Sequence, residues 1–166
     1  MKKLLLLGAF AFLGGAAHAQ EGFKLGGHIG APVGDASKFS SFTLGVDASY
    51  MWNITKGLDV GIASGYSHFF GKDGWDDFGF IPLAASGKYR FSGAPVFVGL
   101  DLGGAISTSE GIDSGLYVYP KVGFQMSTAE IYLGYQNIGS ERDFDRDRRL
   151  DSNFGAINLG VNFFLK

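Results

Sequence analysis

The strict alternation of apolar residues with small or polar ones is the feature that most constrains the fold of this chain. It is clearest in residues 156–166, where every second residue is apolar: Ile157, Leu159, Val161, Phe163 and Leu165. Successive side chains of a strand point to opposite faces, so this segment has one apolar face and one small or polar face. The apolar face must be covered by another part of the protein or by lipid, and the remaining sequence bears on that choice.

Seven further segments alternate in the same way, at residues 23–30, 42–52, 58–67, 81–91, 96–106, 116–126 and 130–136. Longer connections at residues 31–41, 71–77, 107–115 and 139–153 alternate with short turns at 53–57, 92–95 and 127–128. This predicts an all-β fold of eight antiparallel strands, without helices beyond the leader, in an up-and-down order. All the longer loops then lie at one end, as in outer-membrane barrels.

The N-terminal segment has the features of a secretory signal peptide. A basic start at Lys2 and Lys3 precedes an apolar run over residues 4–13, and Ala17-His18-Ala19 forms a small-x-small cleavage site. We therefore expect a signal peptide at residues 1–19 and a single barrel domain at residues 20–166. The apolar run is shorter than the roughly 20 residues of a spanning helix, so any membrane crossing would use strands.

Composition excludes several classes of protein. The chain has no cysteine, which removes disulfides and thiolate metal sites, and its net charge of −2 argues against a nucleic-acid partner. It has 27 glycines but also 15% aromatic residues, whereas a disordered glycine-rich chain is poor in aromatics. These values favour strands that pack closely on one side and present rings on the other.

A soluble lipocalin-like barrel also has eight strands, but its apolar face points inward around a ligand. Here the non-apolar face is rich in glycine, alanine, serine and asparagine, which suits a narrow interior better than a water-exposed sheet. Its charges nearly cancel, as expected in a confined lumen. The predicted polar network of the lumen is Lys24, Lys88, Arg90 and Lys121 with Asp47, Asp59, Asp101 and Glu130.

Aromatic residues also recur at both ends of the apolar stripes, where membrane barrels carry interfacial girdles. Those at the short-turn end are Tyr50, Trp52, Tyr89, Phe91, Phe124 and Phe163, and those at the long-loop end are Phe42, Tyr66 and Tyr135. The transmembrane interpretation is therefore favoured over the soluble one. The large inward residues predict a filled lumen with a structural network rather than a channel; they are Met51, Phe97, Tyr117, Tyr119 and Tyr132.

Two segments suggest chemistry at first sight. Asp143, Asp145 and Asp147 have the spacing that begins a calcium loop, but Arg148 and Phe154 stand where the loop requires glycine and glutamate. The segment is more typical of a solvated loop, in which Arg146, Arg148 and Arg149 are candidates for contacts with lipopolysaccharide phosphates. Ser67 and His68 precede several aspartates, but spacing alone does not make a catalytic triad. We expect no catalytic residues, no metal and no cofactor, and we expect His28 to form hydrogen bonds in the lumen.

The closing segment carries a further pattern, in which Asn158 is followed by Gly160 and Phe163, with Leu165 where a second aromatic usually stands. This resembles the C-terminal assembly signal of the eight-stranded outer-membrane β-barrel family, of the OmpA-transmembrane-domain and OmpX type, and the resemblance extends over residues 20–166. It implies insertion by the barrel-assembly machinery into the outer membrane of a Gram-negative bacterium. It also implies contact with outer-membrane lipid and lipopolysaccharide, and a structural or surface-interaction role for a monomer acting through its extracellular loops. A secreted ligand-binding barrel, a small pore and a lipid-modifying enzyme are the alternatives.

Overall fold

The chain folds into a closed antiparallel β-barrel, seen in a computed structural model that describes residues 22–72, 74, 76–109, 114–142 and 150–165. The strands follow one another around the barrel in chain order, which confirms the predicted up-and-down meander. They are β1 (Phe23–Gly34), β2 (Ser40–Thr55), β3 (Leu58–Gly71), β4 (Phe78–Arg90), β5 (Val96–Ser107), β6 (Gly115–Gln125), β7 (Ala129–Arg142) and β8 (Leu150–Leu165). The predicted signal peptide lies outside the described residues. Within them, no helix is long and apolar enough to cross a membrane.

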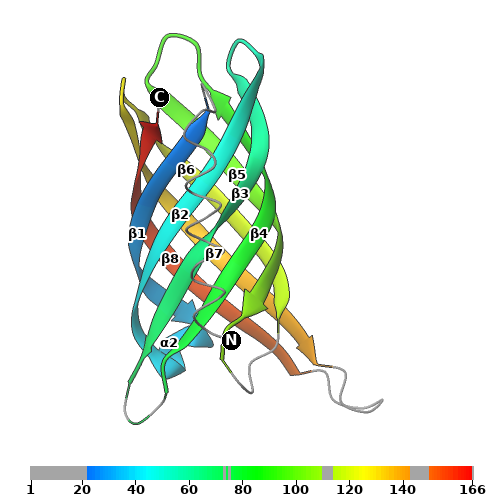
Figure 1. Cartoon of the computed structure of the whole chain (residues 1–166). Coiled ribbons are helices and arrows are strands. Elements are labelled where there is room, and N and C mark those ends of the chain that lie inside the picture. The colour runs from blue at the N-terminus through cyan, green and yellow to red at the C-terminus, as the bar shows by residue number, and fades with distance from the viewer. Residues whose placement is uncertain (1–21, 73, 75, 110–113, 143–149, 166) are drawn as a thin grey trace.

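The connections divide between the two ends of the barrel as the sequence predicts. The β2–β3, β4–β5 and β6–β7 turns lie at the upper end in Figure 1, where β1 begins and β8 ends; this is called the turn end below. The connections β1–β2, β3–β4, β5–β6 and β7–β8 lie at the opposite, loop end. Gly57 shows why a turn needs glycine: its φ is 104°, and a Cβ there would lie 2.8 Å from the Arg90 carbonyl oxygen.

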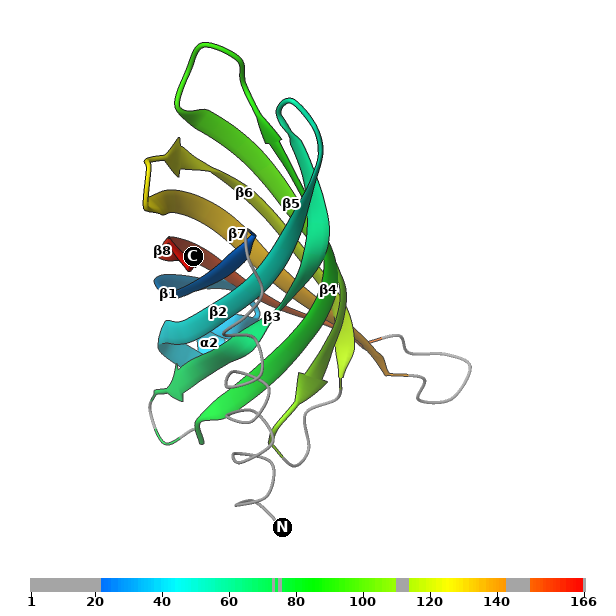
Figure 2. The same cartoon turned by 45° about the horizontal axis from the view of Figure 1, so that its top comes forward.

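Pairing between β1 and β8 closes the barrel over the full length of β1. The register runs from Phe23 opposite Leu165 to Gly34 opposite Phe154, without interruption. Figure 2 shows the resulting wall curving around an interior. Because no strand edge remains free, every strand has two hydrogen-bonded neighbours, which is the condition for strands to exist in lipid.

Two predicted loops are shorter in the structure than the sequence suggests. β1 continues to Gly34 and β2 begins at Ser40, leaving Asp35 and a one-turn helix, α2 (Ala36–Phe39), which the sequence did not predict. Beyond Gly30, β1 pairs with β8 but not with β2, so Pro32 lies where its missing N–H has only one neighbouring strand to satisfy. A proline in this position does not end the strand.

The predicted loop at residues 139–153 is also too long, because β7 continues to Arg142 and β8 begins at Leu150. The two strands pair as far as Arg142 opposite Leu150. The apolar alternation stops near residue 138, and without that alternation the sequence cannot distinguish a continuing hairpin from a loop. The candidate residues Arg146, Arg148 and Arg149 lie outside the described residues.

Candidate functional site

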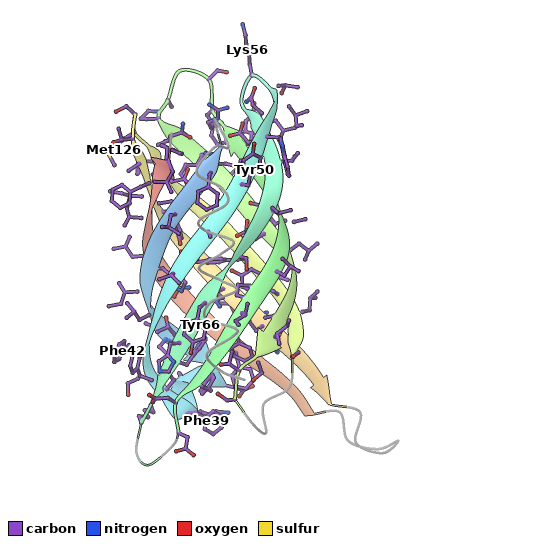
Figure 3. The ribbon with its side chains drawn as sticks, viewed as in Figure 1. Phe39, Phe42, Tyr50, Lys56, Tyr66 and Met126 are labelled. Carbon is purple, nitrogen blue, oxygen red and sulfur yellow. The ribbon has the colours of Figure 1, made fainter. Side chains whose placement is uncertain are left out.

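The barrel wall is apolar outside and polar inside. On β8, Leu159 is 56% exposed, while its neighbour Asn158 is fully buried. The same contrast runs around the wall, as Figure 3 illustrates with side chains such as Phe42 projecting from it. Exposed large apolar residues occur on all eight strands, whereas lysines, carboxylates and amides are buried within. This arrangement reverses that of a soluble protein.

A cluster of ion pairs fills the turn end of the lumen. Glu130 accepts hydrogen bonds from Lys24 Nζ at 3.1 and 3.0 Å and from Lys88 Nζ at 3.0 Å. Asp59 accepts one from Arg90 at 2.9 Å and lies 3.8 Å from Lys88 Nζ. Five of the eight charged residues predicted for the lumen therefore meet here, from β1, β3, β4 and β7. Such a buried network is stabilising only while each charge keeps its partner.

The other three lumen charges lie farther along the barrel and pair differently. Lys121 Nζ donates to Asp101 Oδ2 at 2.6 Å, joining adjacent strands β6 and β5. Among the described residues, no lysine or arginine lies within salt-bridge distance of Asp47; its Oδ2 accepts hydrogen bonds from the Tyr132 hydroxyl at 2.6 Å and from His28 Nδ1 at 2.9 Å. A phenol and an imidazole thus supply the partners of this partly buried carboxylate, which charge counting alone could not show.

A chain of hydrogen bonds through hydroxyl and amide side chains continues from His28 across the lumen. Its Nε2 lies 3.3 Å from Ser67 Oγ, and Ser67 Oγ accepts from Gln136 Nε2 at 3.1 Å. Asn158 Nδ2 donates to Gln136 Oε1 at 3.0 Å, and the Thr43 hydroxyl donates to Asn158 Oδ1 at 3.0 Å. The chain joins β1, β2, β3, β7 and β8 through the interior. His28 therefore forms lumen hydrogen bonds, as its inward position led us to expect.

Ser67, His28 and Asp47 have the connectivity of a catalytic triad, but their surroundings do not allow its chemistry. Ser67 is 2% exposed and its oxygen is already bonded to Gln136, so a substrate carbonyl has no room to approach. The sequence instead placed Ser67 beside His68, and the structure separates these two: His68 lies on the outer face, where its Nε2 donates to Asp77 Oδ2 at 3.2 Å. Adjacent residues of a strand cannot share a site on one face.

Glycines opposite large inward side chains make this packing possible. A Cβ on Gly160 would lie 2.2 Å from Tyr132 Cζ, and one on Gly45 would lie 2.3 Å from His28 Cε1. In each case the glycine is the direct cross-strand partner of the ring, as the registers Tyr132–Gly160 and His28–Gly45 show. The same relation holds for Phe97 with Gly123 and Met51 with Gly61. These glycines thus leave room for large side chains inside a narrow barrel.

An apolar plug, which the sequence analysis missed, fills the loop end of the lumen. Phe69 and Phe78 stack at 4.9 Å, and Phe80 meets both rings edge-on at 6.0 Å. Phe154 of β8 and Ala36 of α2 pack against them. The plug comprises Phe69, Phe78, Phe80, Phe154, Ile138 and Ala36. The inward parity of Phe69 was the available signal, since it lies two residues beyond Ser67 on β3.

A small space lies beside the charged residues at mid-lumen. A cavity of about 20 Å³ is lined by Asp47, Asp101, Lys121 and Asn162, with small residues of β2 and β3. That volume holds about one water molecule. Among the described residues, no group of three or more histidine, aspartate or glutamate side chains is arranged to hold a metal ion.

Of the predicted assembly-signal residues, Asn158 and Gly160 lie on the inner face of β8, where they contact lumen side chains. Phe163 and Leu165 lie on the outer face and are 53% and 43% exposed. The predicted aromatic girdles also occupy the outer face: Tyr50 and Trp52 contact at 4.9 Å at the turn end, and Phe42 stacks on Phe70 at 4.2 Å at the loop end. The rings thus border the apolar wall at both ends.

Structural comparison decides between the barrel classes. The chain is similar to the crystal structure of Neisserial surface protein A, with a TM-score of 0.55 at 20% identity over 86% of this chain and 97% of that chain. The chain has the fold of the eight-stranded outer-membrane barrels. The attachment invasion locus protein Ail of Yersinia pestis matches with a TM-score of 0.53 at 15% identity over 86% of this chain and 95% of that one.

A de novo designed transmembrane β-barrel also matches, with a TM-score of 0.51 at 9% identity over 86% of this chain and 93% of the design. No family model matches the sequence, and no curated protein matches it either. At these identities the likeness establishes the fold alone. An activity must be argued from this chain's own residues.

Proposed function

We propose that this chain is an integral outer-membrane protein of a Gram-negative bacterium, exported through a signal peptide at residues 1–19. It acts as a structural or surface-interaction barrel through the connections at its loop end. The observation that carries this proposal is the reversed wall, apolar outside and ionic inside. Leu83 at 63% and Leu102 at 50% exposure lie on the outer face, whereas Glu130 is 4% exposed and surrounded by lysines.

The reversed wall argues against a secreted ligand-binding barrel. Such a protein would expose the whole apolar band to water, far beyond the few hundred Å² of contiguous apolar surface usual on soluble monomers. Its ligand cavity would be apolar, but the interior here holds salt bridges and a cavity of about 20 Å³. Lipid outside and ion pairs inside satisfy both faces.

The packing inside the barrel supports a closed lumen without catalytic function. The plug of Phe69, Phe78 and Phe80 at the loop end and the cluster around Glu130 at the turn end leave the passage filled with side chains. The Ser67 hydroxyl has no access for a substrate. A surface role then falls to the loop end, and the names of two similar barrels, a surface protein and an attachment invasion locus protein, are in keeping with it.

Membrane integration is tested by extraction and electrophoresis. The protein should fractionate with outer membranes, resist salt extraction, and migrate at a different apparent mass before and after boiling. Recovery in the soluble periplasmic fraction without a heat-dependent shift would refute the proposal. The closed lumen is tested in planar bilayers, where we expect no stable conductance steps; large, reproducible steps would show an open pore.

Partner recognition by the β7–β8 connection is tested by deleting residues 143–149 and screening intact cells for lost binding. We propose that Arg146, Arg148 and Arg149 contact lipopolysaccharide phosphates. Replacing all three with serine should then reduce binding to purified lipopolysaccharide but not to its dephosphorylated form. Equal binding by the variant and the wild type would remove this contact from the proposal.

A further inference from the structure

A polar group of side chains lies on the outer face of β3, within the apolar wall at the loop end. The Tyr66 hydroxyl lies 3.0 Å from His68 Nδ1, and His68 Nε2 donates to Asp77 Oδ2 at 3.2 Å. Asp77 Oδ1 in turn accepts the Gly71 N–H at 2.8 Å, which ties the β3–β4 connection to the end of β3. That N–H and His68 lower the pKa of the Asp77 carboxyl, so the carboxylate is charged at neutral pH.

Aromatic surfaces adjoin these polar atoms. His68 meets Phe70 edge-on at 4.5 Å, and Phe70 stacks on Phe42, which is 41% exposed. Figure 3 shows Phe42 and Tyr66 together at the loop end of the barrel. A row of rings on the outside of β2 and β3 therefore ends in a phenol, an imidazole and a carboxylate.

The Tyr66 side chain occupies the space above Gly79 of the neighbouring strand β4. A Cβ on Gly79 of β4 would lie 2.4 Å from the Tyr66 hydroxyl oxygen and 2.8 Å from Thr108 Oγ1, so the phenol and the Thr108 hydroxyl meet above this glycine. Gly79 is the direct cross-strand partner of His68. The contact of its hydroxyl with His68 Nδ1 and the packing over Gly79 restrict the ring, which lowers the entropy cost of binding a ligand against it.

We propose that Tyr66, His68, Asp77, Thr108 and the adjoining Phe42 form a binding site for the sugar headgroup of an outer-leaflet glycolipid. This inference rests on the proposed function, since it requires the loop end to face the outer leaflet. The site lies where the apolar wall ends and headgroups begin, which is the level of an aromatic girdle. A hydroxylated sugar ring offers a face to stack on an aromatic ring and hydroxyl groups for the phenol, imidazole and carboxylate.

Charge distinguishes a sugar from a phosphate in this position. The hydrogen-bonded group contains the Asp77 carboxylate and no lysine or arginine, and Asp76 next to it is exposed. Lys72 follows β3 in the same connection but is not a member of this hydrogen-bonded group; its backbone N–H donates to the Phe39 carbonyl oxygen. A phosphate beside Asp77 would be repelled, whereas sugar hydroxyls donate hydrogen bonds to it. The proposed ligand is therefore a neutral, polyhydroxylated headgroup anchored by its lipid in the membrane.

Lipid exchange in nanodiscs tests the site. The folded protein, extracted from membranes, is placed in phosphatidylcholine nanodiscs that contain either digalactosyl diacylglycerol or phosphatidylglycerol, and bound lipid is measured by native mass spectrometry. Wild type should retain the galactolipid in preference to both phospholipids. Tyr66→Phe and Asp77→Asn should each weaken that retention about tenfold, the loss expected for a hydrogen bond to a charged or well-ordered group.

Tyr89→Phe is the matched control, because it removes a phenol from the outer face at the turn end, where Tyr89 is 46% exposed beside Phe91. It should leave retention unchanged. A preference for phosphatidylglycerol, or equal retention by all variants, would overturn the sugar site. If free digalactose in detergent bound as tightly as the glycolipid, the claim that the ligand is a membrane lipid would be wrong. The heat-dependent electrophoretic shift reports folding and insertion independently of lipid retention. Its absence in wild type would therefore refute the proposed function itself.

Discussion

Replacing Gly160 with alanine should destabilise the barrel because the space beside it is occupied by a fixed ring. The new methyl carbon would lie 2.2 Å from Cζ and 2.4 Å from the hydroxyl oxygen of Tyr132. The ring cannot move away freely, since its hydroxyl donates to Asp47 at 2.6 Å and its edge packs on Tyr119 at a centroid distance of 6.1 Å. Overpacking of this kind costs about 1–3 kcal/mol. The lower backbone entropy of alanine in the unfolded chain returns about 0.4–1 kcal/mol. The mid-range values leave a net loss of about 1.3 kcal/mol, and the extremes leave at most about 2.6 kcal/mol.

Gly87→Ala is the matched control, because Gly87 lies at an outward position on β4 and a Cβ there would meet no atom within 4 Å. It should be neutral or slightly stabilising, since the same entropy term acts without a clash. The assay is reversible urea unfolding in vesicles, followed by the heat-dependent electrophoretic shift and tryptophan fluorescence. The two glycines belong to the same kind of strand and differ in the space around them.

A double-mutant cycle assigns the cost to the ring. In a Tyr132→Leu background, which removes the aromatic ring, Gly160→Ala should cost less than half of what it costs in the wild type, giving a coupling within the range for contacting residues. An undiminished cost would show that the ring is not what Gly160 accommodates. Equal effects of Gly160→Ala and Gly87→Ala would refute the packing argument altogether.

Three further changes test the faces and the rim. Leu159→Arg puts a charge on the lipid face and should cost about 2–4 kcal/mol in unfolding free energy in vesicles, with a smaller loss for Asn162→Ser; equal losses would mean the faces are misassigned. Glu130→Gln leaves Lys24 and Lys88 without their shared carboxylate and should cost about 3–5 kcal/mol in the same assay, so an unchanged midpoint would show that the cluster is dispensable. Because the folded-state pKa of Asp77 is lowered, its bonds to Gly71 and His68 of β3 hold above the ordinary carboxyl pKa of about 3.9 and are lost as pH falls through the folded value. After correction for the intrinsic pH dependence of exchange, the Gly71 amide should lose protection in that acid range in the wild type. In Asp77→Asn its protection should not change with pH there.

The sequence predicted the fold well because the alternation of side chains between the two faces of a strand can be recognised without knowing which strands are in contact. Alternation puts Leu159 and Asn158 on opposite faces and the charged residues of the lumen on one face, and the small, charge-balanced composition of that face marks it as the inner one. Parity does not reveal which inward residues meet, because contacts across a lumen depend on the stagger of strands far apart in the chain. Asp47 illustrates this: its partners are His28 and Tyr132, and Tyr132 is 85 residues away from it.

The ends of the strands were harder to predict for a different reason. The apolar period marks only the part of a strand that faces lipid, so the continuation of β7 to Arg142 left no pattern to read. Phe69, Phe78 and Phe80 were missed because they lie just beyond the alternating segments at residues 58–67 and 81–91, where the strands were expected to have ended. The apolar plug lies where the lumen meets the loops, and there it replaces ion pairs with ring contacts that need no partners.

The group Ser67, His28 and Asp47 shows why function in this fold must be sought at the rims. Its distances, 3.3 Å from serine oxygen to imidazole and 2.9 Å from imidazole to carboxylate, lie within or near the range of a working triad. What it lacks is space: Gln136 is bonded to the serine, and the plug lies beyond it towards the loop end. Each buried polar atom requires a hydrogen-bond partner. A histidine, a carboxylate and a hydroxyl in a narrow polar lumen will therefore bond to one another whether or not they catalyse a reaction. Reaction requires an approach for substrate as well, and in this barrel the polar side chains that a ligand can reach, such as Tyr66 and Asp77, lie at the loop-end rim, where the wall meets the surroundings.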